Sequence, residues 1–480
     1  MSIITKVAII GAGVSGLKAA ETLLNNSRAP FQDNDIVIVD AQDRIGGRLK
    51  SDSTSSKHGI VYDLGAAWFH DTLTNQVLKD SIKYNYFDVK QDTYYDDKDI
   101  KIYDRNGLID ISGLKINRVV EDLEKYIELY YHEDLNVPDM SLKDIVKKFI
   151  NQYDFMLTSE QVDYSSRIMR YLELWYGISW DKISAKYSIM DHQGRNLLNK
   201  QGYYFIIEAL LKQLNNIRIL LNQPISKINR SNKTNSKPIC IESNTGLKIY
   251  CDYLIVTVPQ SILQLPSNDP YGITWNPPLP NQIQDALSKI HFGALGKVIF
   301  EFDNVWWDET QDRFEILADS NAQLSENITS PPKPFTYPAY LINYASVHKK
   351  PSLVILTQSP LTDYLERNPD QAWKYYKPML QTLVQNGKKL TDPINTITTD
   401  WTVNPYIRGS YAAVETGDDP SDLIIQLSGE FSDCGFGLNN IRFAGEHTIM
   451  DGAGCVHGAY NSGIREANWI LQDIIPKHKL

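Results

Sequence analysis

Two short apolar runs near the start of the chain have the pattern of buried strands. They are Val7-Ala-Ile-Ile10 and Asp35-Ile-Val-Ile-Val-Asp40, and the second ends in an acid. Between them, the run 17–24 places leucine and alanine on one face of a helix. Continuous apolar strands separated by such a helix are typical of a βαβ unit. The pattern therefore predicts an α/β fold at this end of the chain.

A glycine-rich turn joins the first of these strands to the helix. Its sequence is Gly11-Ala-Gly-Val-Ser-Gly16. The first glycine allows a tight turn, the second lets the backbone approach a pyrophosphate, and the third lets the helix pack close to the strand. Asp40, at the end of the second strand, is placed to accept hydrogen bonds from ribose hydroxyls. Together these features predict a dinucleotide site at the helix N-terminus.

The segment after Asp40 adds candidate phosphate ligands. It reads Asp43-Arg-Ile-Gly-Gly-Arg48, in which Arg44 and Arg48 flank two glycines. Guanidinium groups bind phosphate through paired hydrogen bonds, and adjacent glycines let the backbone pass close to a bulky group. We therefore expect both arginines at the pyrophosphate.

The middle of the chain changes in composition and then returns to strands. Helical periodicity dominates between about residues 82 and 196, while 217–228 and 239–259 have the apolar pattern of strands. A further strand, 290–302, contains Lys297 in an apolar stretch. A lysine in such a strand is either exposed or buried, and a buried one has a lowered pKa and needs a partner. The pattern predicts a first domain of 1–81, 197–289 and 430–480, and a substrate domain of 82–196 and 290–429.

Composition narrows the class of ligand. The chain has 480 residues, of which 42% are hydrophobic and 22% charged, so two globular domains are expected. The net charge of −10 argues against binding nucleic acid through phosphate contacts and suits a cationic substrate.

Cysteine spacing and apolar run length bear on the cellular setting. The four cysteines contain no C-x-x-C pair, so neither zinc nor a disulfide framework is expected. No apolar run approaches ~18 residues, and the first strand begins at once, so we expect neither a membrane span nor a signal peptide. A cytoplasmic location is expected. The final His-Lys-Leu only loosely resembles a peroxisomal signal.

The motifs, taken in order, resemble those of the flavin-containing amine oxidases. Within that family they resemble those of the yeast-type polyamine (spermine) oxidases and of a fungal relative named for corticosteroid binding. The segments that carry the resemblance are 11–16, 46–48, 65–70, 71–75, 170–175, 192–196, 290–302 and 444–455. The resemblance implies a Rossmann-like FAD-binding domain interleaved with a substrate domain of mixed sheet and helices. It also implies a tunnel that ends at the flavin.

The resemblance also implies roles for individual residues. Lys297 would hold a water at the flavin, and His70 and Asn196 would lie beside the reactive amine as catalytic residues. The implied cofactor-binding residues are Gly11, Gly13, Gly16, Asp40, Arg44, Gly47, Arg48, Ala66, Ile225, Trp401, Glu446 and Val456. The implied substrate-binding residues are His70, Asp97, Glu173, Trp175, Asn196 and His457.

Two positions depart from the family pattern. His457 stands where the family relative has tyrosine, which would change an aromatic wall over the flavin. Ser410 stands where monoamine oxidases carry the cysteine that bonds to flavin, so non-covalent FAD is expected.

The implied reaction is oxidation of spermine, or of an N-acetylated polyamine, at a secondary amine. Using O₂, it gives spermidine, 3-aminopropanal and H₂O₂ from spermine. The expected partners are therefore a small polyamine and O₂, with no nucleic acid and no membrane, while the oligomeric state is not predicted.

Three alternatives remain open at this point. A flavoprotein that mainly binds a steroid or another apolar ligand is one. A histone-lysine demethylase would need a long helical insertion, and a monoamine oxidase would need the flavin cysteine and a C-terminal membrane helix. None of these features is visible in the sequence.

Overall fold

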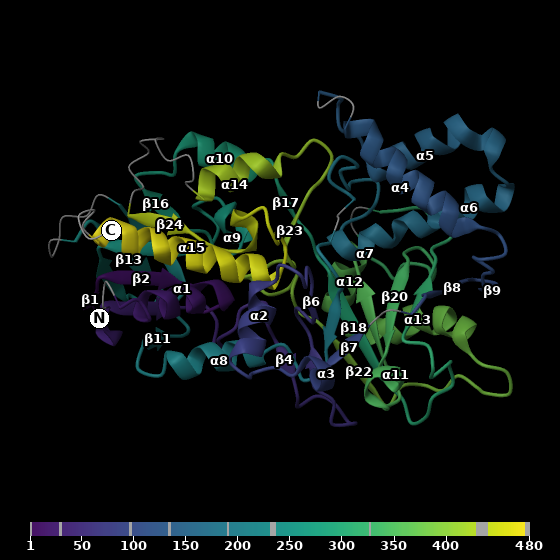
Figure 1. The fold of residues 1–480 in the computed structure, drawn as a ribbon, viewed down its shortest axis with the longest axis horizontal. Coiled ribbons are helices and arrows are strands. Elements are labelled where there is room, and N and C mark those ends of the chain that lie inside the picture. Colours follow the sequence, from purple (N-terminus) through teal and green to yellow (C-terminus); the bar gives the residue numbers. More distant parts are fainter. Residues whose placement is uncertain are drawn as a thin grey trace.

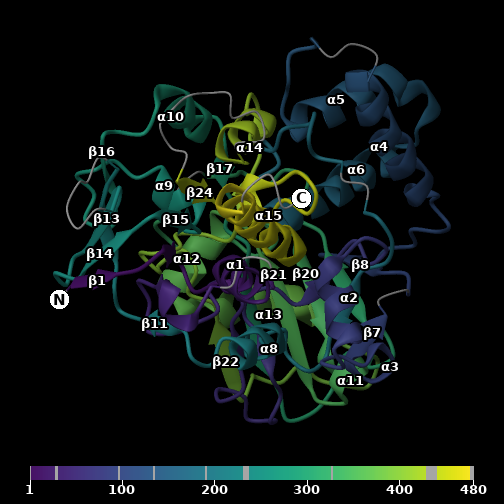
Figure 2. The same cartoon turned by 60° about the vertical axis from the view of Figure 1, so that its left-hand side comes forward.

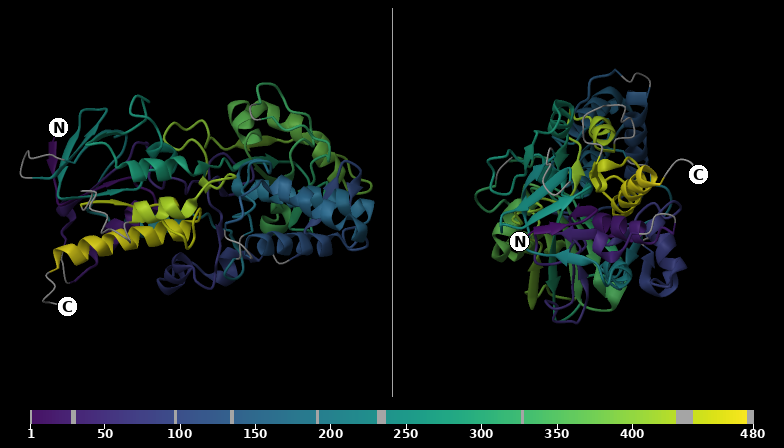
Figure 3. Two further views of the ribbon diagram at one scale, coloured as in Figure 1. Left: turned by 90° about the horizontal axis from the view of Figure 1, so that it is seen from above. Right: turned by 90° about the vertical axis from the view of Figure 1, so that its left-hand side faces the viewer.

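The computed structural model describes residues 2–27, 31–95, 98–132, 136–189, 192–230, 237–325, 328–428 and 440–475. Its elements form two lobes that lie side by side (Figure 1). The purple and yellow segments that begin and end the chain make one lobe together with teal segments from its middle, and the blue and green segments make the other. In Figure 3, β1 (Ser2–Ile4) and the end of α15 (Val456–Ile474) lie at the end of the first lobe that is remote from the second.

A parallel five-stranded sheet is the centre of the first lobe. Its order is β11-β3-β2-β15-β24, and every neighbouring pair is parallel. The strands are β2 (Val7–Ile10), β3 (Ile36–Val39), β11 (Arg218–Leu220), β15 (Tyr253–Val256) and β24 (Ile441–Phe443). The α/β fold predicted from the apolar runs is confirmed.

Both faces of this sheet are covered, which explains why its strands are apolar without alternation. Val7 and Ile9 pack in one cluster with α1 (Val14–Leu24), α8 (Phe205–Gln213) and α15. Ala8 and Ile10 face a second sheet of order β1-β14-β13-β12-β16. Its other strands are β12 (Ile225–Asn229), β13 (Ile239–Ser243), β14 (Lys248–Cys251) and β16 (Thr274–Asn276).

The second lobe is built on a mixed seven-stranded sheet, seen behind α1 and α15 in Figure 2. Its order is β22-β18-β21-β20-β19-β8-β9, antiparallel except between β19 and β8. The strands are β8 (Lys101–Asp104), β9 (Gly107–Leu108), β18 (Gly296–Glu301), β19 (Arg313–Ile316), β20 (Ala339–Asn343), β21 (Ser352–Thr357) and β22 (Asn395–Thr398). One face packs on α12 (Leu361–Arg367) and α13 (Ala372–Leu380).

A group of helices completes the second lobe. They are α4 (Ile116–His132), α5 (Leu142–Tyr153), α6 (Ser159–Ile168) and α7 (Glu173–Tyr176). In α4 the buried residues Val119, Leu123 and Ile127 recur every four positions, as an amphipathic helix requires. Ser141 caps α5, and Thr158 with Gln161 forms a capping box on α6.

A small sheet of order β6-β10-β7 connects the lobes and brings distant segments together. It consists of β6 (Trp68–Phe69), β7 (Thr93–Tyr95) and β10 (Leu197–Asn199). Because Leu197 pairs with Phe69, the residues that flank this pair, His70 and Asn196, become neighbours. The other strands and α-helices are β4 (Ser51–Asp52), β5 (Tyr62–Asp63), α2 (Gln76–Lys83), α3 (Val89–Asp92), α9 (Gln260–Leu263), α10 (Asn281–Ser288), β17 (His291–Phe292), α11 (Tyr344–His348), β23 (Ala412–Ala413) and α14 (Pro420–Ser428).

The two lobes share an apolar cluster. Leu64, Ala67 and Leu198 pack there with Ile299 and Tyr340 of the seven-stranded sheet. The domain limits given by the sequence stay a prediction. Within the described ranges, none of the helices combines the length and apolar character that crossing a bilayer requires.

Candidate functional site

A cavity of about 410 Å³ runs between the lobes and collects most of the expected site residues. At one end it is bounded by the turn between β2 and α1, and at the other by residues of α7, β18 and β20. The expected residues that line it are Gly11, Gly13, Asp40, Gly47, Arg48, Ala66, Ile225, Trp401, Glu446, Val456, His70, Asn196, Lys297 and Trp175. One continuous space therefore joins the predicted nucleotide site to the predicted substrate site.

The glycine turn leaves space at the N-terminus of α1. Gly11 has a φ of +111°, and a Cβ there would lie 2.1 Å from the hydroxyl oxygen of Thr257, so a larger residue is excluded. A Cβ at Gly13 would meet nothing within 4 Å, because this position faces the cavity. Gly13 is also the N-cap residue of α1, where no side chain bonds the first N–H groups. These N–H groups remain available to an anion such as a pyrophosphate.

Asp40 is fixed at the cavity edge by two backbone groups. Its Oδ2 accepts the N–H of Ala12 at 2.7 Å, and its Oδ1 accepts the N–H of Gln42 at 2.8 Å. Burial raises the pKa of Asp40, and these hydrogen bonds oppose that rise. The remaining lone pairs can accept hydroxyl groups, as the ribose-binding prediction requires.

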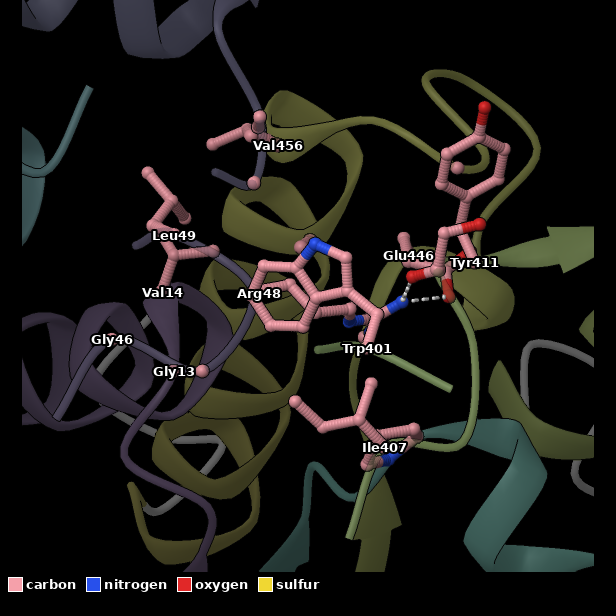
Figure 4. A pocket seen from close by; sticks show the side chains of 18 of the residues that line it. Gly13, Val14, Gly46, Arg48, Leu49, Trp401, Ile407, Tyr411, Glu446 and Val456 are labelled. Carbon is pink, nitrogen blue, oxygen red and sulfur yellow. Dashed lines mark hydrogen bonds and ion pairs between the residues drawn. The ribbon is translucent and has the colours of Figure 1, made fainter. Parts of the chain in front are cut away.

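Arg48 and Glu446 form an ion pair in the middle of the cavity (Figure 4). Nη1 of Arg48 lies 2.7 Å from Oε1 of Glu446 and also donates to the carbonyl oxygen of Ser410 at 2.9 Å. The second oxygen of Glu446, Oε2, is buried and has no hydrogen-bond partner within the described part of the chain. A ligand hydroxyl at this point would satisfy that oxygen.

Lys297 lies on β18 at the other end of the cavity and is 6% exposed. Its Nζ donates to the carbonyl oxygens of Asp63 at 2.6 Å and of Gly65 at 2.7 Å. Burial lowers the pKa of Lys297 to about 8. Since an ammonium has three N–H groups and two of them donate to these carbonyls, one N–H group remains for another acceptor.

His70 and Asn196 form a second polar contact at this end. Nδ1 of His70 lies 2.9 Å from Oδ1 of Asn196, and the side chain of Asn75 donates to the carbonyl oxygen of His70 at 2.7 Å. Burial lowers the pKa of His70 to about 4, so its imidazole is neutral at pH 7. A neutral imidazole can contact an amine without adding positive charge.

Three expected cofactor or substrate residues lie away from the cavity lining. Gly16 serves packing, because a Cβ there would lie 2.1 Å from the carbonyl oxygen of Gly11. Arg44 donates to the backbone carbonyls of residues 45, 47 and 49, so its charge holds the Gly46-Gly47 turn and does not face the cavity. Glu173 is fully buried and paired with Arg170, which removes its carboxylate from the substrate path.

His457 is a fourth expected residue that lies away from the cavity lining. His457 is 3% exposed at the start of α15, and its Nε2 lies 3.3 Å from Oδ2 of Asp71. Its ring is directed at this carboxylate and not into the cavity, so the expected change in an aromatic wall is not found there. Asp97, expected beside the amine chain, lies outside the described residues.

Several cavity residues were missed by reasoning from the sequence. The hydroxyl of Tyr411 donates to the carbonyl oxygen of Trp175 and joins the two walls. His192, Arg313, Tyr340 and Cys455 also line the cavity. His192 precedes Asn196 by four residues and could have been noticed, whereas nothing local marks Arg313 or Tyr340 as cavity residues.

Glu315 is a buried carboxyl on β19, two residues beyond Arg313. It is 3% exposed, and its Oε1 has no hydrogen-bond partner among the residues that the structure describes. It stands opposite Tyr340 of β20. Burial raises the pKa of Glu315 to about 8, because removal from water disfavours the charged form of the carboxyl. The folded protein therefore favours the neutral form.

Replacing Glu315 with glutamine is expected to stabilise the protein in a pH-dependent way. The ordinary pKa of this carboxyl is 4.5. The pKa of Glu315 is higher in the folded protein than in the unfolded chain. The contribution of this carboxyl to stability is therefore complete below pH 4.5 and is lost as pH rises toward about 8. The loss is about 3 kcal/mol at pH 7. In thermal unfolding, Glu315→Gln should be more stable than the parent at pH 7 and nearly equal to it near pH 4.5. An equal gain in stability at both pH values would contradict this prediction.

Comparison with known proteins identifies the family. Residues 14–471 match the family described as "Flavin containing amine oxidoreductase". The chain belongs to this family. It is 56% identical to a "Corticosteroid-binding protein" of Candida albicans over 98% of this chain and 96% of the relative. It is 26% identical to "Polyamine oxidase 4" of rice, Oryza sativa subsp. japonica, over 96% of this chain and 88% of the relative.

A human relative and a solved structure extend the comparison. The chain is 22% identical to the human "Peroxisomal N(1)-acetyl-spermine/spermidine oxidase", over 97% of this chain and 94% of the relative. A redesigned putrescine oxidase superposes with a TM-score of 0.67 at 17% identity, covering 98% of this chain and all of that chain. This structural likeness confirms the fold expected from the resemblance to flavin amine oxidases.

Family membership implies a flavin cofactor, and the cavity fits FAD. The open position at Gly13 suits the pyrophosphate, and Asp40 suits the adenosine ribose. The unsatisfied Oε2 of Glu446 suits a hydroxyl of the ribityl chain. The N-terminus of α15, a helix that begins at Val456, also borders the cavity and favours negative charge there.

Proposed function

We propose that this flavin-dependent amine oxidoreductase is a polyamine oxidase that acts on spermine or on N-acetylated polyamines. Spermine would be oxidised at a secondary amine to spermidine and 3-aminopropanal, with O₂ converted to H₂O₂. The observation that carries the proposal is the single cavity in which the dinucleotide turn and the Lys297–His70–Asn196 group face the same space. Two relatives that match nearly the whole chain support the same substrate class, because one is named as a polyamine oxidase and the other as an N(1)-acetyl-spermine/spermidine oxidase.

The chain's own groups suit amine oxidation. Bound FAD would supply the oxidising chemistry by accepting a hydride from the carbon beside the amine. Trp175 and Tyr340 pack edge to face, with centroids 5.3 Å apart, and form apolar walls that exclude water from a carbon chain. His70, neutral at pH 7, contacts the reactive end without repelling an amine. Lys297 offers an N–H group at the same end.

We further propose that FAD is bound without a covalent link. The resemblance places Ser410 where monoamine oxidases carry the flavin-bonding cysteine. Its hydroxyl donates to the carbonyl oxygen of Gly293 and accepts the N–H of Leu295. Cys455 also lines the cavity, but burial raises the pKa of its thiol to about 12 and leaves it unreactive. Flavin that stays with the acid-precipitated chain would contradict this proposal.

An oxygen-consumption screen tests the substrate class. We expect spermine or acetylspermine to support oxygen uptake with a kcat/KM at least about tenfold above that of a simple monoamine, because a longer chain contacts more of the cavity walls. Spermidine and the monoamine complete the set. Comparable rates with the monoamine would exclude a polyamine oxidase and leave the wider family assignment in place.

A second candidate function is the binding of an apolar ligand such as a steroid. It is favoured by the similarity to the fungal protein named for corticosteroid binding. It is also favoured by the cavity lining, because within the described ranges the acids that line it are Asp40 and Glu446, and Glu446 is paired with Arg48. Tight steroid binding together with no oxygen uptake from any amine would select this function.

A further inference from the structure

Two stacked imidazoles form part of the cavity wall, and their partners differ. The rings of His70 and His192 have centroids 5.2 Å apart and an interplanar angle of 14°. Nδ1 of His70 faces the amide oxygen of Asn196, whereas Nδ1 of His192 lies 3.2 Å from a carboxylate oxygen of Asp71. If each Nδ1 donates its proton to that oxygen, the lone pair of each ring is on Nε2.

A backbone hydrogen bond fixes the carboxylate of Asp71 beside His192. Its Oδ1 also accepts the backbone N–H of Gln193 at 2.7 Å. Although partial burial acts to raise it, the pKa of Asp71 is lowered by the Gln193 N–H and by the neighbouring His192, so this carboxylate is charged at pH 7. The titratable groups that surround His192 in the described part of the chain are His70 and Asp71, with His457, Asp451 and Cys455 beyond Asp71.

Amine oxidation needs a proton acceptor before the oxidation itself. An alkylamine is an ammonium ion near pH 7, and its carbon can lose a hydride only when the nitrogen has a free electron pair. His70 is a poor acceptor, because burial holds its pKa at about 4. The side chain of His192 is 29% exposed, so it borders both the cavity and the solvent.

We propose that His192, held by Asp71, accepts the proton that the substrate ammonium loses in the cavity. The N–H bond of the ammonium breaks, its proton moves to Nε2 of His192, and the electron pair stays on the substrate nitrogen. The proton then leaves to solvent from the exposed side of the imidazole. The carboxylate of Asp71 stabilises the imidazolium formed in between, as in other Asp–His pairs. This inference rests on the proposed amine oxidation.

The pH dependence of anaerobic flavin reduction by spermine tests the proposal. At pH 7, His192→Gln should slow reduction about 100-fold, the usual range for loss of a general base. The deficit should shrink to less than about threefold by pH 10, where free amine is already neutral in solution. Asp71→Asn should show a deficit with the same pH dependence. His132→Gln, at the exposed end of α4, is the matched control and should match the parent at every pH.

A weakly basic amine and two structural readouts complete the design. A β-fluorinated polyamine analogue is largely neutral at pH 7. It should therefore reduce the bound flavin of His192→Gln and of the parent at similar rates. Flavin content and the thermal midpoint of His192→Gln should equal those of the parent. A deficit equal at all pH values, or no deficit at all, would overturn the assignment of His192. A parent protein that no amine reduces would instead overturn the proposed function and this inference with it.

Discussion

Substituting Lys297 with methionine is expected to slow one half-reaction, flavin reduction or reoxidation, about 100-fold while FAD stays bound. Methionine preserves the length of the side chain but has no N–H group. The carbonyl oxygens of Asp63 and Gly65 therefore lose their hydrogen-bond donor. A water held at this end of the cavity would lose the same donor. Stopped-flow measurement of both half-reactions, together with flavin content, gives the result.

A lysine of the same sheet provides the control. Lys101 lies on β8, is partly exposed and pairs with Asp308 across 2.7 Å. Lys101→Met removes a lysine ammonium that does not line the cavity. The rates of both half-reactions in this variant should therefore equal those of the parent. If Lys297→Met also leaves both half-reactions within about twofold of the parent, Lys297 has no role in the reaction.

The second large effect is expected from Glu173→Gln, and it concerns stability. Both carboxylate oxygens of Glu173 accept from the guanidinium of Arg170, at 2.8 and 3.2 Å. Trp180 and Gln358 donate to the same carboxylate. The neutral amide leaves the charge of Arg170 buried without its counterion, which should lower the free energy of unfolding by about 3–5 kcal/mol. The midpoint temperature of thermal unfolding should fall by several degrees, while KM for spermine stays unchanged.

An exposed pair with the same spacing serves as the comparison. Arg118 and Glu121 are also three residues apart on a helix, but their side chains are 75% and 62% exposed. Glu121→Gln should therefore change the free energy of unfolding by no more than about 1 kcal/mol. If Glu173→Gln keeps the parent's stability and raises KM, then Glu173 binds substrate as the resemblance to the family implied.

The nucleotide end of the cavity could be predicted because its signals are local. The turn from Gly11 to Gly16 and the acid at Asp40 lie within one βαβ unit, so their geometry follows from a short stretch of sequence. Glu173 shows the limit of such local reasoning. Its partner Arg170 precedes it by only three residues, yet the resemblance implied a substrate-binding carboxylate, and it is the folded structure that shows a buried ion pair.

The substrate end depends on contacts between distant segments. His457 lies close to Asp71, which is almost four hundred residues earlier in the chain, and no local pattern indicates that they are neighbours. His70 and His192 become stacked only because β6 and β10 pair in the small connecting sheet. Residue types could therefore be predicted here, but the direction in which each side chain points could not.

Anaerobic titration of the oxidised protein with spermine tests the central claim most directly. If the cavity holds FAD beside a bound polyamine, spermine should bleach the visible absorbance of the oxidised flavin completely, and admitting O₂ should restore it with formation of H₂O₂. An absorbance that stays unchanged with spermine, acetylspermine and a monoamine across pH 6–10, while a steroid binds in the same cavity, would contradict the account.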